Sequence, residues 1–465
     1  MIRLFRQYIS PRKTIFIIGE GVLIFLAVSL ASYFLLGRDT SVLSMLTSIW
    51  YKVLLITLVA QFSLYFNDLY ESETSASNID LAARLIQSVG ITSIALAIIY
   101  IFWPDMIIGR WIFFVSLVLL LLFLVSWRIL YSIAISKKLL AERAIMIGSD
   151  ELARDIMHQI ETRKDLSYNI SAILTQNKQQ GADGKLNGIP LHLGFDHIFD
   201  VAMAENVKSI IIALDEKRGI LPVEQLLKCK VNGINIIDGE SFFERVTGKL
   251  LVERINPSWL IFSDGFSKSK TSRAVKRSLG FLVSIVSLVL LSPLLLIVAV
   301  AIKLNSRGPV LFSQERVGEN GKAYTLYKFR SMIHDAEKKS GPVWASEDDP
   351  RITRVGRVIR KLRIDEFPQL WNVFKGDMSV VGPRPERPHF VEELQKKIPY
   401  YNERFTVKPG ITGWAQVKYA YGASEHDALE KLKYDLYYIK NMSLIIDLMV
   451  IFHTIKIVLL GRGSR

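Results

Sequence analysis

The chain has very little cysteine and few charged residues for its length. Cys229 is the single cysteine among 465 residues, which excludes a disulfide scaffold and a thiolate metal cluster. The seven histidines show no metal-ligand spacing such as His-Glu-x-x-His. Charged residues make up 22% of the chain and hydrophobic residues 50%, a balance that excludes a disordered protein.

Apolar residues are gathered into long runs, and the mean hydropathy is +0.27. Four runs near the N-terminus each approach the roughly 20 residues that cross a bilayer as a helix. They cover residues 15–36, 45–66, 85–103 and 110–135. The first run has no small-residue cleavage signature, so we expect a retained anchor. Residues 1–138 are therefore predicted to form a four-helix transmembrane bundle.

Basic residues predict how this bundle is oriented. Lys137, Lys138 and Arg143 follow the fourth run, so the positive-inside rule places both ends of the bundle in the cytoplasm. Glu20 and Lys52 fall inside predicted spans. An ionisable residue there indicates either a functional site or a polar pair between helices.

Residues 139–262 alternate strand and helix patterns. Strands are predicted at residues 143–148, 169–174, 209–214 and 235–238, with helical patterns between them. This alternation predicts a Rossmann-like α/β domain with a parallel sheet. The first turn has Gly148 but no further glycines of a dinucleotide fingerprint, and it places Asp150 and Glu151 where phosphate would lie. A structural or regulatory domain is favoured over dinucleotide binding.

A fifth apolar run covers residues 278–304, inside a predicted catalytic domain that spans residues 263–465. Basic residues flank both of its ends, and Ser292-Pro293 lies near its centre. Proline removes a helix hydrogen bond, and the Ser292 hydroxyl is a candidate partner for a freed backbone group. We expect a re-entrant helix hairpin that enters and leaves by one membrane face. A proline-kinked full span is the alternative.

The segment after this run is rich in arginine. Arginines recur every third residue at positions 351, 354, 357, 360 and 363, with apolar residues between them, which predicts an amphipathic helix with a cationic face. Such a face suits nucleic acid, phospholipid headgroups or the phosphates of a nucleotide-linked substrate. The neighbouring membrane segment favours the last two.

Two carboxylates follow the arginines directly. Asp365 and Glu366 could form an ion-pair cap, or they could act chemically. Aspartate is a competent nucleophile toward phosphorus, and an adjacent carboxylate can hold Mg²⁺ against a diphosphate. Both interpretations are open at this point.

Six motifs carry a resemblance to a known family. They are Ser292-Pro293 and the segments 328–332 (KFRSM), 349–353 (DPRIT), 364–370 (IDEFPQL), 382–386 (GPRPE) and 407–417 (VKPGITGWAQV). In this order they strongly resemble the bacterial sugar transferase family, the monotopic polyprenyl-phosphate phosphoglycosyl transferases. The whole layout is similar to the long form with a membrane bundle and a Rossmann-like domain. Segments 421–424 and 434–441 are similar to a branch linked to exopolysaccharide export.

The resemblance implies a two-step reaction. Asp365 would attack the β-phosphorus of a UDP-sugar, release UMP and hold the phosphosugar, which then passes to undecaprenyl (polyprenyl) phosphate. By the same resemblance Glu366 would hold Mg²⁺, and Lys328, Arg330 and Arg360 would stabilise phosphoryl charge. The loop Pro383-Arg384-Pro385 would help to seat the nucleotide. The core motif has Ile364 and Phe367 where leucine is more usual. Many members carry an arginine shortly after Val417, whereas this chain continues with Lys418-Tyr419-Ala420.

The resemblance also implies a location and partners. We expect a multi-pass protein of the bacterial inner (cytoplasmic) membrane, surrounded by its lipids, with the catalytic domain on the cytoplasmic face. Downstream glycosyltransferases are expected partners, a homodimer is left open, and nucleic acid is not expected, since charge alone supports it. The alternative is a non-enzymatic membrane scaffold of a polysaccharide assembly complex. Residues 443–460 are predicted to form an interfacial amphipathic helix or a core helix.

Overall fold

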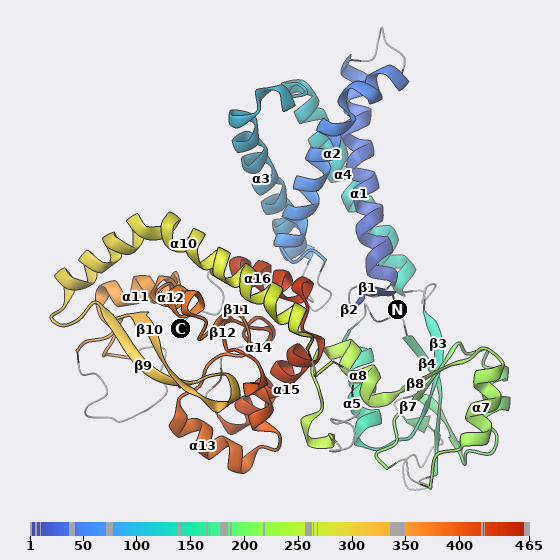
Figure 1. The fold of residues 1–465 in the computed structure, drawn as a ribbon. Coiled ribbons are helices and arrows are strands. Elements are labelled where there is room, and N and C mark those ends of the chain that lie inside the picture. Colours follow the sequence, from blue (N-terminus) through green and yellow to red (C-terminus); the bar gives the residue numbers. More distant parts are fainter. Residues whose placement is uncertain are drawn as a thin grey trace. The chain divides into compact units, whose positions relative to one another are not determined.

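The computed structural model describes residues 2–4, 7–9, 11–36, 42–70, 78–136, 141–163, 166, 168–176, 185–186, 188–216, 219–255, 263, 265–266, 268–334, 349–419, 422 and 424–459 (Figure 1). The chain divides into two compact units, Met1–Val246 and Thr247–Arg465. Lys137, Lys138 and part of the segment 421–424 lie outside the described residues. So do residues on the predicted domain boundaries at 138 and 262, and those boundaries stay predictions.

The N-terminal unit begins with two short antiparallel strands, which are followed by long apolar helices. The elements are β1 (Ile2–Leu4), β2 (Gln7–Ile9), α1 (Pro11–Leu36), α2 (Val42–Phe66), α3 (Asn78–Phe102), η1 (Pro104–Met106) and α4 (Arg110–Ser136). Helix α1 packs against α2 and α4, and α2 packs against α3. Among the described residues, five helices are long and apolar enough to cross a membrane: Lys13–Leu35, Ile49–Phe66, Ile79–Phe102, Trp111–Ile135 and Lys270–Asn305. The prediction of membrane helices is confirmed.

One ion pair lies inside the packed helices α1 and α4. Glu20 is fully buried, and its Oε1 lies 2.7 Å from an Arg128 nitrogen. This is the pair between helices that the sequence left open for Glu20. Its partner is Arg128 rather than Lys52, whose Nζ instead donates to the Ile107 carbonyl at 3.3 Å.

The α/β part of this unit is a six-stranded sheet in the order β5-β6-β4-β3-β7-β8. All neighbours are parallel except β5 and β6. The strands are β3 (Glu142–Ile147), β4 (Tyr168–Thr175), β5 (Lys185–Leu186), β6 (Ile189–Leu193), β7 (Ser209–Ile212) and β8 (Asn235–Asp238). The helices are α5 (Glu151–Thr162), α6 (Ile198–Ala204), α7 (Val223–Val231) and α8 (Gly239–Thr247). Apart from β5, the order is that of a Rossmann-type sheet, which confirms the predicted α/β class. Strands β5 and β6 were not predicted.

Gly148 lies where the strand order reverses, between β3 and β7. Its φ is +111°, and a Cβ at this position would lie 2.3 Å from the Ala213 carbonyl oxygen. Only glycine permits this backbone contact. Next to it, the hydroxyls of Ser149 and Thr175 share a buried hydrogen bond of 2.7 Å. In the described residues this turn is therefore used for packing between strands.

The C-terminal unit is mainly helical, with two small sheets. Its elements are η2 (Val252–Arg254), α10 (Lys270–Asn305), β9 (Leu311–Val317), η3 (Glu319–Gly321), β10 (Ala323–Phe329), α11 (Arg354–Lys361), η4 (Ile364–Glu366), α12 (Gln369–Lys375), β11 (Ser379–Val381), α13 (Pro388–Lys397), η5 (Tyr401–Thr406), β12 (Gly410–Thr412), α14 (Trp414–Lys418), α15 (Glu425–Asn441) and α16 (Leu444–Leu459). Strands β9 and β10 form an antiparallel hairpin, and β11 pairs with β12 in parallel. The main core gathers around α15, whose Leu432, Leu436 and Ile439 are fully buried.

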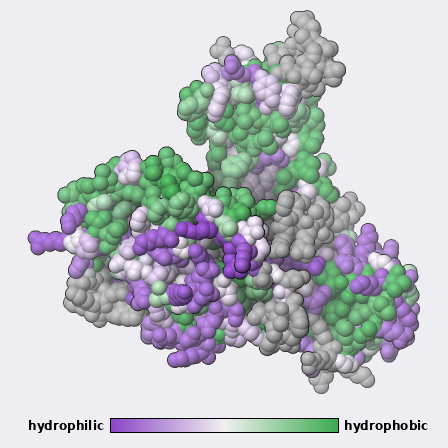
Figure 2. Space-filling view, viewed as in Figure 1, coloured by the Kyte–Doolittle hydropathy of each residue, from purple (hydrophilic) through white to green (hydrophobic). Residues whose placement is uncertain are grey.

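The fifth apolar run is one helix, α10, with Pro293 inside it. Figure 1 shows α10 as an arch, and Figure 2 shows its apolar surface. The expectation of a helix–break–helix segment differs from this continuous helix. Proline cannot bond the carbonyl four residues before it, which here is that of Val289. The Ser292 hydroxyl donates to this carbonyl at 2.7 Å, so the backbone oxygen keeps a partner.

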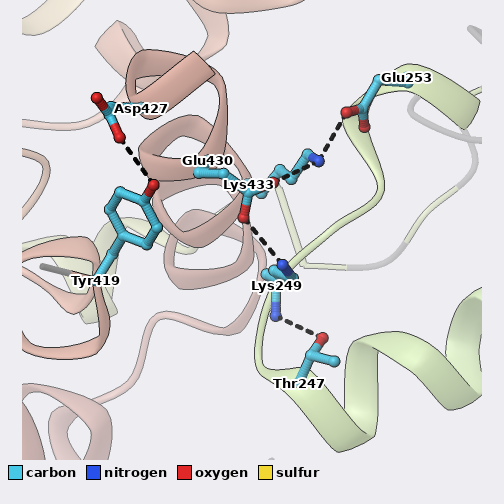
Figure 3. Close-up of polar contacts among 7 residues, drawn as sticks. All are labelled: Thr247, Lys249, Glu253, Tyr419, Asp427, Glu430 and Lys433. Carbon is cyan, nitrogen blue, oxygen red and sulfur yellow. Dashed lines mark hydrogen bonds and ion pairs between the residues drawn. The ribbon is translucent and has the colours of Figure 1, made fainter. Parts of the chain in front are cut away.

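Alternating charges bind the segment that follows α8 to helix α15 (Figure 3). Lys249 Nζ lies 2.9 Å from a Glu430 oxygen. Lys433 Nζ lies 2.7 Å from Glu430 and 2.6 Å from Glu253. Residues 247–255 therefore pack with the C-terminal unit.

Helix α16 has two apolar faces with different surroundings. Ile446 and Val450 are fully buried in the core around α15. Leu444, Leu448 and Ile455 are exposed, and their spacing places them on one stripe of the helix. The helix therefore combines a core face with an outward apolar face. The core interpretation describes the first face, and an interfacial position of the second stays a prediction.

Candidate active site

A tight turn places Asp365 and Glu366 between two helices. Thr353 caps the start of α11 by accepting from the Gly356 N–H at 2.9 Å. Helix α11 ends where Arg363 adopts a left-handed conformation, with φ of 54°. The 3₁₀ turn η4 then carries both carboxylates, and α12 begins three residues later.

The predicted arginine-rich helix over residues 351–363 is therefore too long. The structure gives α11 only the eight residues Arg354–Lys361. Arg351 lies before the helix and binds Asp349, with an N–O distance of 2.6 Å. Its hydrogen bonds hold the pKa of Asp349 at about 2. A period of three drifts around a helix of 3.6 residues per turn, so all five arginines could not share one face. Arg354, Arg357 and Arg360, which do lie on α11, fall within about 120° of one another and give this shorter helix the expected cationic face.

Glu366 is buried and binds two cations. Lys328 Nζ on β10 donates to its Oε1 at 3.1 Å, and an Arg384 Nη donates to the same oxygen at 2.8 Å. Burial alone would raise the pKa of Glu366, but Arg384 and Lys328 hold it well below its usual value. Glu366 is therefore ionised throughout the physiological range. Burial lowers the pKa of Lys328, and the Glu366 carboxylate opposes that effect.

Asp365 has the opposite electrostatic setting. Burial, and next the negative charge of Glu366, raise its pKa to about 6, while Lys328, Arg360 and Arg384 act to lower it. A carboxylate with a raised pKa is more basic and less well solvated than an ordinary aspartate. It is nevertheless ionised near pH 7. This combination suits a nucleophile better than a structural cap.

A buried asparagine on α12 binds the backbone of the strand that carries Lys328. Asn372 is fully buried; its side-chain oxygen accepts from the Tyr327 N–H at 3.2 Å and its amide donates to the Thr325 carbonyl at 2.7 Å. These bonds join α12 to β10 next to Lys328. Asn372 was not among the predicted site residues, although a lone asparagine within the apolar residues 370–374 was a usable signal.

Arg384 projects from a rigid loop. Pro383 and Pro385 on either side of it are buried, while the Arg384 side chain is 33% exposed. The loop is joined to β12 by a hydrogen bond from the Gly410 N–H to the Pro383 carbonyl at 2.9 Å. A Cβ on Gly382 would lie 2.4 Å from the Lys408 carbonyl oxygen. Glycine is therefore required where the GPRPE and VKPGITG motifs touch.

A buried ion pair also supports the loop that carries Arg384. Arg404 on η5 donates to Asp435 on α15 at 2.8 Å and to the Arg384 carbonyl at 3.1 Å. It also donates to the Tyr401 hydroxyl at 2.6 Å. The exposed fractions of the Arg404 and Asp435 side chains are 5% and 2%. Neither residue was predicted, because nothing in the local sequence pairs positions 31 residues apart.

Two other predicted residues, Arg360 and Arg330, differ in how they relate to Asp365 and Glu366. Arg360, on the last turn of α11, acts on Asp365 through its charge. Arg330 instead binds the end of α10: it donates to the Arg307 carbonyl at 2.8 Å and to the Ser306 carbonyl at 2.9 Å. A catalytic role for Arg330 stays a prediction. Lys418 is the first residue of the segment that departs from the family motif. It lies over the Trp414 ring, with 5.2 Å between its Nζ and the ring centroid.

The donor set fits a magnesium ion that substrate helps to bind. Within the described residues, no group of three or more His, Cys, Asp or Glu side chains gathers into a self-contained metal site. Mg²⁺ commonly takes one or two carboxylates and completes its coordination with phosphate oxygens and water. Glu366 offers one such carboxylate, and both of its ion pairs use Oε1.

Comparison with known proteins agrees with this architecture. The model of the family described as bacterial sugar transferase matches residues 271–461, and the model of a CoA-binding domain matches residues 65–237. An undecaprenyl-phosphate glucose phosphotransferase of Komagataeibacter xylinus is 34% identical over 374 residues, which cover 78% of this chain and 68% of that protein.

Two further relatives match a smaller share of the chain. A UDP-N-acetylgalactosamine-undecaprenyl-phosphate N-acetylgalactosaminephosphotransferase of Aeromonas hydrophila is 43% identical over 240 residues, covering 52% of this chain and 56% of that relative. Exopolysaccharide production protein PSS of Rhizobium leguminosarum bv. phaseoli is 43% identical over 189 residues, covering 39% of this chain and 93% of that protein.

The chain therefore belongs to the bacterial sugar transferase family. The resemblance seen in the sequence motifs is confirmed, and so is the prediction of an enzyme of the polyprenyl-phosphate sugar transferase class.

The buried Arg404–Asp435 pair yields a first prediction. Asp435→Asn leaves the Arg404 charge buried without its counter-ion, which typically costs about 3–5 kcal/mol. We expect the amides of α15 and of the Arg384 loop to exchange with deuterium at least about 100-fold faster than in the wild type, measured by mass spectrometry of the full chain. The matched control is Glu393→Gln, which removes an exposed carboxylate from α13. Equal exchange in Asp435→Asn and the wild type would contradict a supporting role for the pair.

Proposed function

We propose that the chain transfers a sugar-1-phosphate from a UDP-sugar to undecaprenyl phosphate at the bacterial inner membrane, as a membrane-committing step of exopolysaccharide or O-antigen synthesis. One observation carries the proposal. Asp365, with its raised pKa, adjoins the buried Glu366, on which Lys328 and Arg384 converge. The names of the relatives support the substrates.

In the proposed first step, a carboxylate oxygen of Asp365 attacks the β-phosphorus of the UDP-sugar. A bond forms between that oxygen and phosphorus, the bond from phosphorus to the bridging oxygen breaks, and UMP leaves with the electron pair. The phosphosugar stays on Asp365 as an acyl phosphate. Covalent capture divides one transfer between two anions into two easier steps.

In the second step, an oxygen of undecaprenyl phosphate attacks the same phosphorus. The acyl phosphate bond breaks, Asp365 recovers its carboxylate, and the product carries the sugar on a diphosphate. Asp365 suits the roles of nucleophile and then leaving group, because its raised pKa still leaves it ionised near pH 7.

The surrounding charges determine how phosphate is received. Lys328 and Arg384 are already oriented by Glu366, so their positive charges can face a phosphate without reorganisation. Arg360 adds positive charge on the Asp365 side. Glu366 would hold Mg²⁺ together with the substrate's phosphate oxygens, and the ion would supply neutralisation of the diphosphate.

The proposal extends to the membrane segments. Helices α1–α4 would form a four-helix transmembrane bundle, and α10 would enter and leave the membrane by the cytoplasmic face, bending at Pro293. The arch of α10 in Figure 1 and the bond from Ser292 to Val289 support this topology. A cytoplasmic catalytic domain would meet UDP-sugars where they are made. A membrane scaffold, the alternative function, has no use for the paired Lys328, Arg384 and Glu366.

Removing the nucleophile tests the mechanism. Asp365→Asn is nearly isosteric but cannot open the phosphoanhydride, so we expect transfer to fall at least about 1,000-fold with the fold intact. Glu366→Gln should also fail, because Lys328 and Arg384 lose their anionic partner. UMP release and lipid-linked sugar are measured with undecaprenyl phosphate and a panel of UDP-sugars. Glu315→Gln, an exposed carboxylate on β9, is the matched control. A normal rate for Asp365→Asn, in a preparation free of wild-type enzyme, would disprove the assignment.

The raised pKa of Asp365 predicts a pH profile. The attacking form is the carboxylate, so kcat/KM for the first half-reaction should fall about tenfold per pH unit below about pH 6. UMP release is measured without the lipid acceptor. The acceptor is a phosphate monoester that itself titrates at about pH 6 and would add its own limb to the profile. Lys328→Gln removes a charge that lowers the Asp365 pKa. The acidic limb of this variant's pH profile should therefore lie at higher pH than in the wild type, even though the variant reacts more slowly. A profile that stays flat to about pH 4 would contradict the proposed setting of Asp365.

Thiol labelling tests the topology. Ser272→Cys and Ser306→Cys lie at the two ends of α10 and are introduced separately into a Cys229→Ser background. We expect both to be shielded from an impermeant thiol reagent in intact cells and both to be labelled in inverted vesicles. Pro293→Leu should straighten α10 and lower activity, whereas Leu290→Val, also exposed on α10, should not. Labelling of Ser306→Cys from outside intact cells would overturn the re-entrant topology.

A further inference from the structure

A cavity of about 380 Å³ lies at the base of α10, away from the carboxylate pair. It is lined on one side by the first turns of α10 and on the other by residues at the C-terminal end of α12, including Val373. Asp365 and Glu366 precede the N-terminus of α12, so the two sites lie at opposite ends of this helix. The volume is in the range of small-ligand pockets.

The lining is strongly basic. Five cationic side chains line the cavity, against one carboxylate, that of Glu319; the cations are Lys268, Arg273, Lys276, Arg277 and Lys408. Of these, Lys276 is neutralised by Asp447 on α16 at 2.7 Å. The cavity therefore carries an excess of positive charge, which favours an anionic ligand.

Three of the cations are held in place by uncharged partners. Arg277 donates to the Phe374 carbonyl at 2.7 Å, and Lys408 donates to the Gly376 carbonyl at 2.7 Å. Arg273 donates to the Lys268 carbonyl at 3.1 Å. Carbonyl oxygens fix the direction of these side chains without cancelling their charge. Each retains further N–H donors, so the arrangement is pre-organised for the oxygens of a phosphate.

The cavity also lies at a polarity boundary. Helix α10 is basic up to Arg277 and mainly apolar over residues 279–302, with exposed apolar side chains such as Leu282 and Val289. Helix α16, which supplies Asp447 to Lys276, presents its own outward apolar stripe. A membrane that covers these two apolar faces would place the cavity at the depth of its headgroups.

We infer that this cavity binds the phosphate headgroup of an anionic phospholipid. Phe266, Met378 and Met442 also line the cavity and would give apolar contact for the glycerol and the first acyl carbons. Basic pockets beside membrane helices on the cytoplasmic side commonly take such headgroups. The site is distinct from the proposed transfer reaction and does not depend on it. It anchors the base of α10 to the anionic leaflet.

Lipid binding to the purified full chain in detergent tests the inference. Native mass spectrometry, with phosphatidylglycerol or zwitterionic phosphatidylcholine as the added lipid, gives an apparent Kd for each. We expect phosphatidylglycerol to bind more tightly. Arg273→Gln combined with Lys408→Gln should weaken it about 10-fold or more, because each basic residue near an anionic headgroup contributes about fivefold. Phosphatidylcholine binding should not change.

A matched charge variant separates binding in the cavity from attraction to basic surface in general. Lys270 is exposed at the same end of α10 but does not line the cavity. Lys270→Gln should therefore leave the Kd for phosphatidylglycerol unchanged. If it weakens binding as much as the cavity variant does, the effect is general surface charge and the inference is wrong. Inorganic phosphate that displaces phosphatidylglycerol at equal concentration would show a free-anion site instead. If the double variant does not fold, Arg273→Gln alone, at an exposed position, should give about a fivefold loss.

A kinetic measurement tests whether the cavity binds the acceptor lipid instead. In phosphatidylcholine nanodiscs, the cavity variant should keep the wild-type KM for undecaprenyl phosphate. A raised KM there would assign the cavity to the acceptor and overturn the headgroup inference. Failure of the transfer reaction in every form of the protein, with phosphatidylglycerol binding intact, would affect only the proposed function.

Discussion

The C-terminal unit depends on a buried negative charge that two cations from different elements must neutralise. Glu366 cannot remain ionised and buried without partners, because removing a carboxylate from water costs several kcal/mol. Lys328 comes from β10 and Arg384 from the loop after β11, and both reach the same oxygen. This one requirement fixes the hairpin, the 3₁₀ turn and the loop relative to each other. The negative charge it creates also raises the pKa of the adjacent Asp365.

The supports of this centre are mostly backbone contacts and buried polar groups. Gly382, Gly410 and Gly413 let two chain segments meet without side chains between them. Asn372 joins α12 to β10, and Arg404 joins the Arg384 loop to Asp435. A buried network of this kind is costly when any member loses its partner. The geometry around Asp365 is therefore maintained by residues that do not touch it.

The membrane imposes a second constraint on the same unit. Backbone polar groups in hydrocarbon need internal partners, and Pro293 has no N–H to donate to the Val289 carbonyl. The Ser292 hydroxyl supplies the missing hydrogen bond. In the N-terminal unit, Glu20 and Arg128 solve a similar problem by pairing with each other inside the helices. The Val289 carbonyl and the charges of Glu20 and Arg128 thus each have a partner within the protein.

The sequence by itself determined the membrane helices, the α/β alternation and the motifs of the catalytic unit. These signals are local: a long apolar run, a strand-helix period and a short motif each lie within a few tens of residues. The same motifs predicted Asp365, Glu366, Lys328 and Arg384 as site residues, and the structure brings these four together. The arginine-rich helix is shorter than its pattern predicts, because Arg351 binds Asp349 before the helix begins and Arg363 ends it.

Only the tertiary structure decided that Glu20 pairs with Arg128 and that Arg330 binds the end of α10. It alone also showed that Arg404 and Asp435 support the Arg384 loop. These pairings join residues distant in the chain, and which charge meets which is decided by packing and desolvation rather than by local pattern.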